Sequence, residues 1–174
     1  TMIHKQIIPI VFCFCSLHLK AQTDKLWNGK KAAVVLTYDD AISQHLDNAI
    51  PVLDSLGLKA TFYITSNSIA LRELISDWRR VAMKGHELGN HTVNHPCNGG
   101  TGREWVSAEY DLRNYTIKKI QDELRMTNAF LQALDGKTRR TYAFTCGDRK
   151  VQDSLYINGM KEEFVSARSV RSQM

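Results

Sequence analysis

The sequence predicts a single α/β domain in which helices cover a parallel β-sheet. Short runs rich in β-branched and aromatic residues alternate along the chain with longer segments of helical apolar spacing. The 174 residues are 43% hydrophobic and 24% charged, which is enough apolar material for one core and unlike a disordered chain. Because such folds bind ligands where their strands end, polar residues that follow the predicted strands are candidate site residues.

The first 22 residues are expected to form a secretion signal peptide rather than part of the fold. Lys5 precedes the uninterrupted apolar run 7–17, which is too short to cross a bilayer comfortably, and the small residue Ala21 lies near the expected cleavage point. A buried N-terminal strand is the alternative. We therefore expect a secreted or periplasmic protein, with no stable membrane span, whose domain occupies residues 23–174.

Five segments have the composition of β-strands. The first is apolar and ends in two acids, and the others are bounded by turn formers or by helical segments. The predicted strands are 31–39, 58–65, 86–92, 141–146 and 163–169.

Three segments have the apolar spacing of amphipathic helices, namely 42–56, 70–84 and 116–134. A glycine follows each of them closely, as is common at helix C-termini. The sequence stops just after the last predicted strand, with no helix to cover it, so we expect the domain to be truncated at its C-terminus.

The charge pattern does not indicate nucleic-acid binding. The net charge is +5, but the lysines and arginines are scattered and form no long basic run. A mildly basic, solvated surface explains this pattern.

Two adjacent carboxylates, Asp39 and Asp40, end the first predicted strand. Side chains alternate between the faces of a strand, so both acids can serve one site only where the strand breaks into a loop. The alternative is that Asp40 caps the next helix and that Asp39 is merely solvated.

A pair of histidines, His91 and His95, follows the third predicted strand with i, i+4 spacing. One helical turn would place both imidazoles on one side, as two ligands of a metal require. A zincin metalloprotease has Glu after its first histidine, whereas Thr92 stands here, so any catalytic base has to come from elsewhere. One Asp with two His leaves coordination positions open, and the second Asp is free to accept a proton. A non-haem iron oxygenase also uses two His and one carboxylate, but in a different order along the chain.

These motifs resemble those of the polysaccharide deacetylases, also called the NodB-homology domain or carbohydrate esterase family four. The resemblance covers about residues 30–170 and rests on four stretches: TYDD (37–40), GLKATFYIT (57–65), GHELGNHT (85–92) and HTVNH (91–95).

The resemblance implies a distorted (β/α) barrel with fewer than eight strands, here incomplete at its C-terminus. It implies metal-dependent hydrolysis of N-acetyl groups on an acetylated glycan such as peptidoglycan, a chitin-like polymer or an exopolysaccharide, with release of acetate. An O-acetyl esterase acting on xylan is the close alternative. Carried over, Asp39 is the general base. Asp40, His91 and His95 then hold a divalent metal, zinc or less often cobalt, and Thr92 supports the histidine loop.

The sequence departs from the family pattern in two ways. In AFTCGD (143–148), the backbone N–H of Cys146 would serve the oxyanion, but the arginine that the family places there is absent and Arg140 is the nearest substitute. No histidine follows His95, so the general acid of the family is missing from these residues. A catalytically deficient, glycan-binding remnant is therefore a second interpretation.

The family fold would place Cys97 and Cys146 on one rim of the site. The resemblance then implies a disulfide between them, which export would permit. Two free thiols are the first alternative, and additional soft metal ligands are the second.

Overall fold

The computed structural model describes residues 29–170, and the chain divides into a short N-terminal segment that ends at Val34 and a main unit that begins at Val35. The proposed signal peptide lies outside the described residues. Residues 29–34 contain no β-strand. The fold and the site below belong to the main unit.

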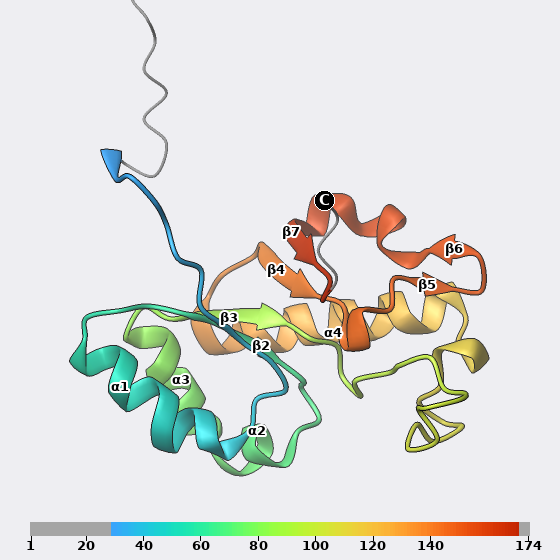
Figure 1. Cartoon of the computed structure of the whole chain (residues 1–174), viewed down its shortest axis with the longest axis horizontal. Helices are drawn as coiled ribbons and strands as arrows, with labels where there is room; N and C mark the ends of the chain where they lie inside the picture. The colour runs from blue at the N-terminus through green and yellow to red at the C-terminus, as the bar shows by residue number, and fades with distance from the viewer. Residues whose placement is uncertain (1–28, 171–174) are drawn as a thin grey trace, which may run out of the picture. The chain divides into compact units, whose positions relative to one another are not determined.

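A five-stranded parallel sheet forms the centre of this unit (Figure 1). Its strands lie in the order β1-β2-β3-β4-β7, so their order in space follows their order along the chain. All neighbouring pairs are parallel, which brings the carboxyl ends of the strands to one edge. The strands are β1 Thr37–Tyr38, β2 Thr61–Ile64, β3 Glu87–Asn90, β4 Arg140–Ala143 and β7 Phe164–Arg168.

The first strand is much shorter than the sequence predicts. Strand β1 pairs with β2 alone and lies at the edge of the sheet. The ladder starts at Thr61, whose N–H donates to the carbonyl of Leu36, so the apolar residues before Leu36 have no strand beside them among the described residues. Val34 and Val35 are accordingly 83% and 75% exposed.

Helices connect the strands. They are α1 Ile50–Ser55, α2 Ile69–Glu73, α3 Ile75–Met83 and α4 Ile117–Asp135, with a π-helical turn, η2 His45–Ala49, before α1. The segment predicted as one helix over 70–84 is two helices, because Leu74 leaves the helical conformation (φ −118°, ψ 33°). None of the helices in the described part of the chain has the length and apolar character that a membrane crossing requires.

Both termini of the long helix α4 have capping residues that can be recognised in the sequence. The hydroxyl of Thr116 accepts the backbone N–H of Lys119 at 3.1 Å, which caps the N-terminus. Gly136 ends the helix in the left-handed conformation (φ 74°), which glycine adopts without a side-chain clash.

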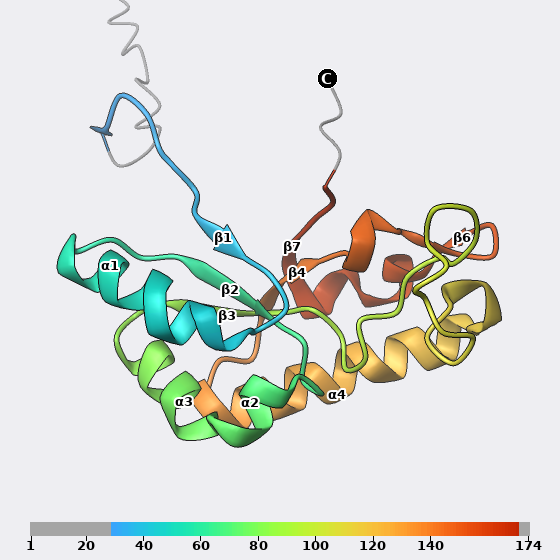
Figure 2. The same cartoon turned by 60° about the horizontal axis from the view of Figure 1, so that its bottom comes forward.

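The core consists of two clusters that share α4. Leu131 packs in the first cluster with residues of β2 and α3 such as Phe62 and Trp78. Leu124 packs in the second with residues of β4 such as Tyr142. Helix α4 also packs against α3, below the sheet in Figure 2. Because one rigid helix serves both clusters, it offers a fixed support to the loops at the carboxyl edge of the sheet.

The connection from β4 to β7 contains elements that the sequence analysis missed. A small antiparallel hairpin pairs β5 Lys150–Val151 with β6 Ser154–Leu155, and a 3-10 helix, η5 Tyr156–Glu163, follows it. These segments are too short and too polar to show helical or alternating periodicity.

Candidate metal centre

The three predicted ligands come together at the carboxyl edge of the sheet. Asp40 follows β1, and His91 follows β3 directly. Oδ1 of Asp40 lies 3.4 Å from Nε2 of His91 and 3.2 Å from Nε2 of His95. One candidate ligand atom from each residue lies within 4.8 Å of the others, which suits a single cation.

The two imidazoles are oriented so that each directs Nε2 towards Asp40. Nδ1 of His91 donates to the carbonyl of Ala143 at 2.8 Å. Nδ1 of His95 lies 3.6 Å from the sulfur of Cys97, and that sulfur belongs to a disulfide and carries no proton, so the ring nitrogen is the donor. The tautomers are therefore assigned from these contacts, and a lone pair on each Nε2 faces a carboxylate.

This arrangement fits a divalent cation. Two lone pairs and a carboxylate oxygen that face one another repel unless a proton or a cation lies between them. A proton on each Nε2 has the same effect as a cation: hydrogen bonds from His91 and His95 then hold the pKa of Asp40 well below its usual range, although partial burial opposes them. One carboxylate and two neutral imidazoles are also a donor set that zinc accepts.

The histidine loop, residues 91–95, is held in an unusual backbone conformation. Thr92 and His95 both have positive φ, at 66° and 54°. Such values cost about 1–3 kcal/mol each for non-glycine residues and persist only where contacts impose them. Here the hydroxyl of Thr92 accepts the N–H of His95 at 2.9 Å, and the side-chain oxygen of Asn90 accepts the N–H of Thr92 at 2.8 Å. Thr92 thus lies where it can support the loop.

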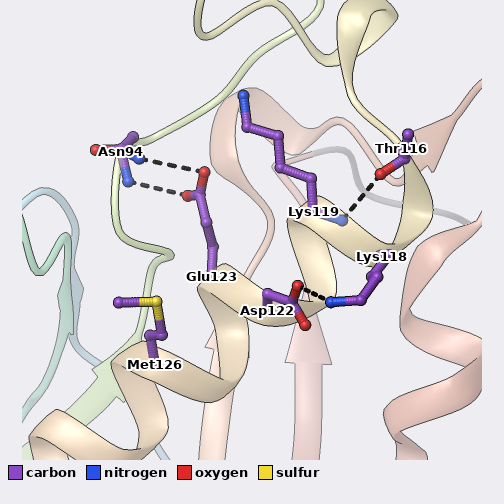
Figure 3. A pocket seen from close by; sticks show the side chains of 7 residues that line it. All are labelled: Asn94, Thr116, Lys118, Lys119, Asp122, Glu123 and Met126. Atoms are coloured by element: carbon purple, nitrogen blue, oxygen red, sulfur yellow. Dashed lines mark hydrogen bonds and ion pairs between the residues drawn. The ribbon is translucent and has the colours of Figure 1, made fainter.

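A buried carboxylate on α4 holds the loop from behind (Figure 3). Glu123, which is 6% exposed, accepts the backbone N–H of Asn94 at 3.1 Å and its side-chain amide at 3.2 Å. The hydroxyl of Tyr115 donates to the same carboxylate at 2.7 Å. Glu123 was not predicted as a site residue, but its place between the buried residues Ile120 and Leu124 on the helix was a usable signal.

A hollow of about 390 Å³ lies beside Glu123, and Figure 3 shows the side chains that line it. It contains none of the three candidate metal ligands. Its lining residues are Asn94, Thr116, Lys118, Lys119, Asp122, Glu123 and Met126.

The predicted base, Asp39, has a different partner from the other three residues. It forms an ion pair with Arg168, the last residue of β7. The Arg168 guanidinium also lies over the ring of Tyr63, at 4.7 Å from its centroid. Asp39 is therefore oriented by an arginine.

Arg140 does not lie beside Asp39. It opens β4, and its buried guanidinium bonds Asp135 at 2.7 Å and the carbonyl of Leu88 at 2.9 Å. A strand rises about 3.3 Å per residue, so the start of β4 lies far from the carboxyl edge. Arg168 ends a neighbouring parallel strand at that edge, which is a signal that the sequence analysis did not use.

The loop after β4 contains Cys146, which has a positive φ of 55°. The structure joins Cys146 and Cys97 in a disulfide. In addition, the hydroxyl of Thr145 donates to the carbonyl of Pro96. This loop is thus tied twice to the chain segment that follows His95.

Comparisons with known proteins agree with this geometry. The family model described as polysaccharide deacetylase matches residues 27–161. The peptidoglycan-N-acetylmuramic acid deacetylase PdaA of Bacillus subtilis is 26% identical over 150 residues, which are 84% of this chain and 46% of that protein. The chain spans less than half the length of the first curated relatives it matches.

Solved structures agree with the fold. A peptidoglycan N-acetylglucosamine deacetylase superposes with a TM-score of 0.61 at 22% identity, over 79% of this chain and 56% of its own. A pseudoenzyme of carbohydrate esterase family four from Bacillus anthracis superposes with a TM-score of 0.57 at 19% identity, over 76% of this chain and 41% of its own. The predicted α/β fold of the polysaccharide deacetylase type is confirmed.

Proposed function

Because the chain belongs to the polysaccharide deacetylase family, we propose that it hydrolyses N-acetyl groups on a polysaccharide and releases acetate. The observation that carries this proposal is the convergence of Asp40, His91 and His95 on one point, with a separately held Asp39 nearby. A catalytic metal site needs this combination of three protein ligands and a free base.

Asp40, His91 and His95 would hold the cation, and zinc is the metal that we propose, with cobalt as a substitute. When bound, such a cation polarises a carbonyl group and brings the pKa of a bound water to about 7.

The residues of the chain supply the other functions. Asp39 accepts the proton of the attacking water, and Arg168 orients the Asp39 carboxylate for this transfer. The backbone N–H of Cys146 is the proposed donor to the carbonyl oxygen on which negative charge develops. The disulfide and the Thr145 contact limit the movement of that N–H relative to the histidine loop.

The proposed substrate is an acetylated glycan outside the cytoplasm, such as peptidoglycan, a chitin-like polymer or an exopolysaccharide. The two peptidoglycan deacetylases among the relatives and the solved structures support an acetamido sugar. The apolar leader and the disulfide support export to a secreted or periplasmic location. An O-acetylated xylan is the alternative substrate.

A second candidate function is glycan binding without turnover. A pseudoenzyme among the solved structures supports this candidate.

Acetate release separates these candidates. The full chain, with zinc or cobalt added, would be incubated with N-acetylated chitooligosaccharides, peptidoglycan fragments and acetylated xylan. We expect acetate from an N-acetylated substrate, and a loss of about 10²–10⁴-fold in kcat for Asp39→Asn with metal affinity retained. Metal binding without acetate from any of these substrates would overturn the proposed hydrolysis and support the binding protein.

A further inference from the structure

We propose that Cys97 and Cys146, once reduced, form with His95 a second metal site that takes a soft divalent cation and competes with Asp40 and His91 for the His95 ring. One candidate ligand atom from each of these residues lies within 4.8 Å of the others. The hydrolysis proposed above makes no use of the thiol forms of these cysteines. The thiolate site itself does not depend on that proposed function. Only the expected loss of hydrolysis, when His95 leaves the Asp40 site, rests on it.

The distances already suit a cation bound by nitrogen and sulfur. Zinc bonds of about 2.1 Å to nitrogen and 2.3 Å to sulfur, at the tetrahedral angle, place the two ligand atoms about 3.6 Å apart. The observed distance from Nδ1 of His95 to Sγ of Cys97 is 3.6 Å. No large movement of either residue is therefore needed to accept the ion.

Opening the disulfide supplies the third ligand. Two zinc-bound thiolates lie about 3.8 Å apart, so the sulfurs have to separate by rotation of the side chains. The Cα atoms of Cys97 and Cys146 are 5.7 Å apart. Cys146 is partly exposed while Cys97 is fully buried, so a reductant reaches the pair from the Cys146 side.

The chemistry balances with a dithiol as reductant. The dithiol gives two electrons and two protons to the Cys97–Cys146 disulfide and becomes a disulfide itself. Binding of the cation then displaces two thiol protons to solvent, because thiolates are the ligating form.

The two sites exclude each other because a neutral imidazole has one lone pair. When His95 serves the Asp40 site, its Nε2 lone pair binds the cation and its proton is on Nδ1, which lies 3.6 Å from the sulfur of Cys97. Ligation through Nδ1 moves the proton to Nε2 and removes that ligand from the Asp40 site. His91 has no such choice, since the carbonyl of Ala143 accepts its Nδ1 proton at 2.8 Å.

Cobalt(II) absorption tests the site, since thiolate–cobalt bonds give a near-ultraviolet charge-transfer band and carboxylate–imidazole sites do not. The full chain would carry Cys13→Ser and Cys15→Ser in every sample, so that only Cys97 and Cys146 report. We expect no such band in the oxidised protein and a band of one-to-one stoichiometry after reduction with a phosphine, which is itself no thiol. Cys146→Ser should abolish this band, and His95→Ala should weaken cobalt binding to the reduced protein at least tenfold.

Several results would overturn the proposal. They are a reduced protein without the band, a band that His95→Ala leaves unchanged in strength and affinity, and a reduced chain whose circular dichroism shows unfolding. The double variant Cys97→Ser/Cys146→Ser lacks both the disulfide and the thiols, so its cobalt affinity at the Asp40 site should exceed that of the reduced protein. Failure of acetate release alone would contradict the proposed hydrolysis and leave the thiolate site standing.

Discussion

The two loops that supply the candidate ligands are held to very different degrees. The histidine loop leaves the buried strand β3, and the side chain of His91 is only 2% exposed. The aspartate loop, residues 39–41, leaves the two-residue edge strand β1, and the side chain of Asp40 is 54% exposed. The buried His91 is thus positioned before any cation binds, whereas Asp40 supplies charge from a more exposed loop, in which Asp40 and Ala41 also have positive φ, at 78° and 54°.

The contacts of each loop explain the difference. The histidine loop is held by Asn90, Thr92, Glu123 and the nearby disulfide. For the aspartate loop, the contacts that we identify are the ion pair of Asp39 with Arg168 and the bond from Ser68 to the carbonyl of Ala41 at 3.2 Å. A preorganised half and an adjustable half together allow a site to select a cation and still admit it.

Removal of a buried histidine should have the largest effect. We expect His91→Ala to lower zinc affinity by more than the 10–100-fold typical of changes around a metal ligand, because a ligand itself is lost. Competition with a chromophoric chelator measures this affinity. His86→Gln is the matched control, since His86 is equally buried but bonds Asp54 at 3.1 Å, away from the site. Equal affinities of the two variants would remove His91 from the site.

Glu123 tests the support of the histidine loop. Glu123→Gln keeps one acceptor but places an amide against the N–H groups of Asn94, so we expect zinc affinity to fall about 10–100-fold. The fall in kcat should follow, with little change in KM, because Glu123 lies behind the loop rather than facing substrate.

The control for Glu123 is its neighbour on the helix. Asp122→Asn removes an ion pair with the exposed Lys118 and touches no residue of the loop. Its zinc affinity should equal that of the unchanged protein. If Glu123→Gln behaves like Asp122→Asn, the histidine loop does not depend on its support from α4.

Arg168 tests the support of the aspartate loop. Arg168→Met should lower kcat about tenfold through poorer orientation of Asp39 and should leave zinc affinity unchanged. Arg125→Met is the matched control, because Arg125 of α4 forms an exposed ion pair with Glu163 of η5. A loss of zinc affinity in Arg168→Met would mean that the two loops are less independent than their contacts indicate.

The same comparison shows what the sequence can and cannot reveal. The meeting of Asp40, His91 and His95 was predictable, because parallel strands end at one edge and the motifs follow those ends. Arg140, the nearest substitute along the chain for the arginine of the family, bonds Asp135 instead, whereas Arg168 at the carboxyl end of β7 pairs with Asp39. Glu123 was missed because its role depends on how α4 packs against a loop 29 residues earlier. Contacts that follow from strand order are readable, and contacts that follow from tertiary packing are not.

The smallest expected effect is on the stability of the protein in acid, which limits the pH range in which the two loops can be compared. Hydrogen bonds from Lys84 and His86 hold the pKa of Asp54 well below its usual value, with burial opposing them. A depressed carboxyl pKa contributes stability above the unfolded-state value of about 3.9, and this contribution is lost as the pH falls through the folded pKa. Asp54 contacts neither loop. When the pH is lowered below 4, the urea concentration at the unfolding midpoint should fall more for the unchanged protein than for Asp54→Asn. Parallel curves for the two proteins would show that acid sensitivity arises elsewhere, and the aspartate loop would then be the first place to examine.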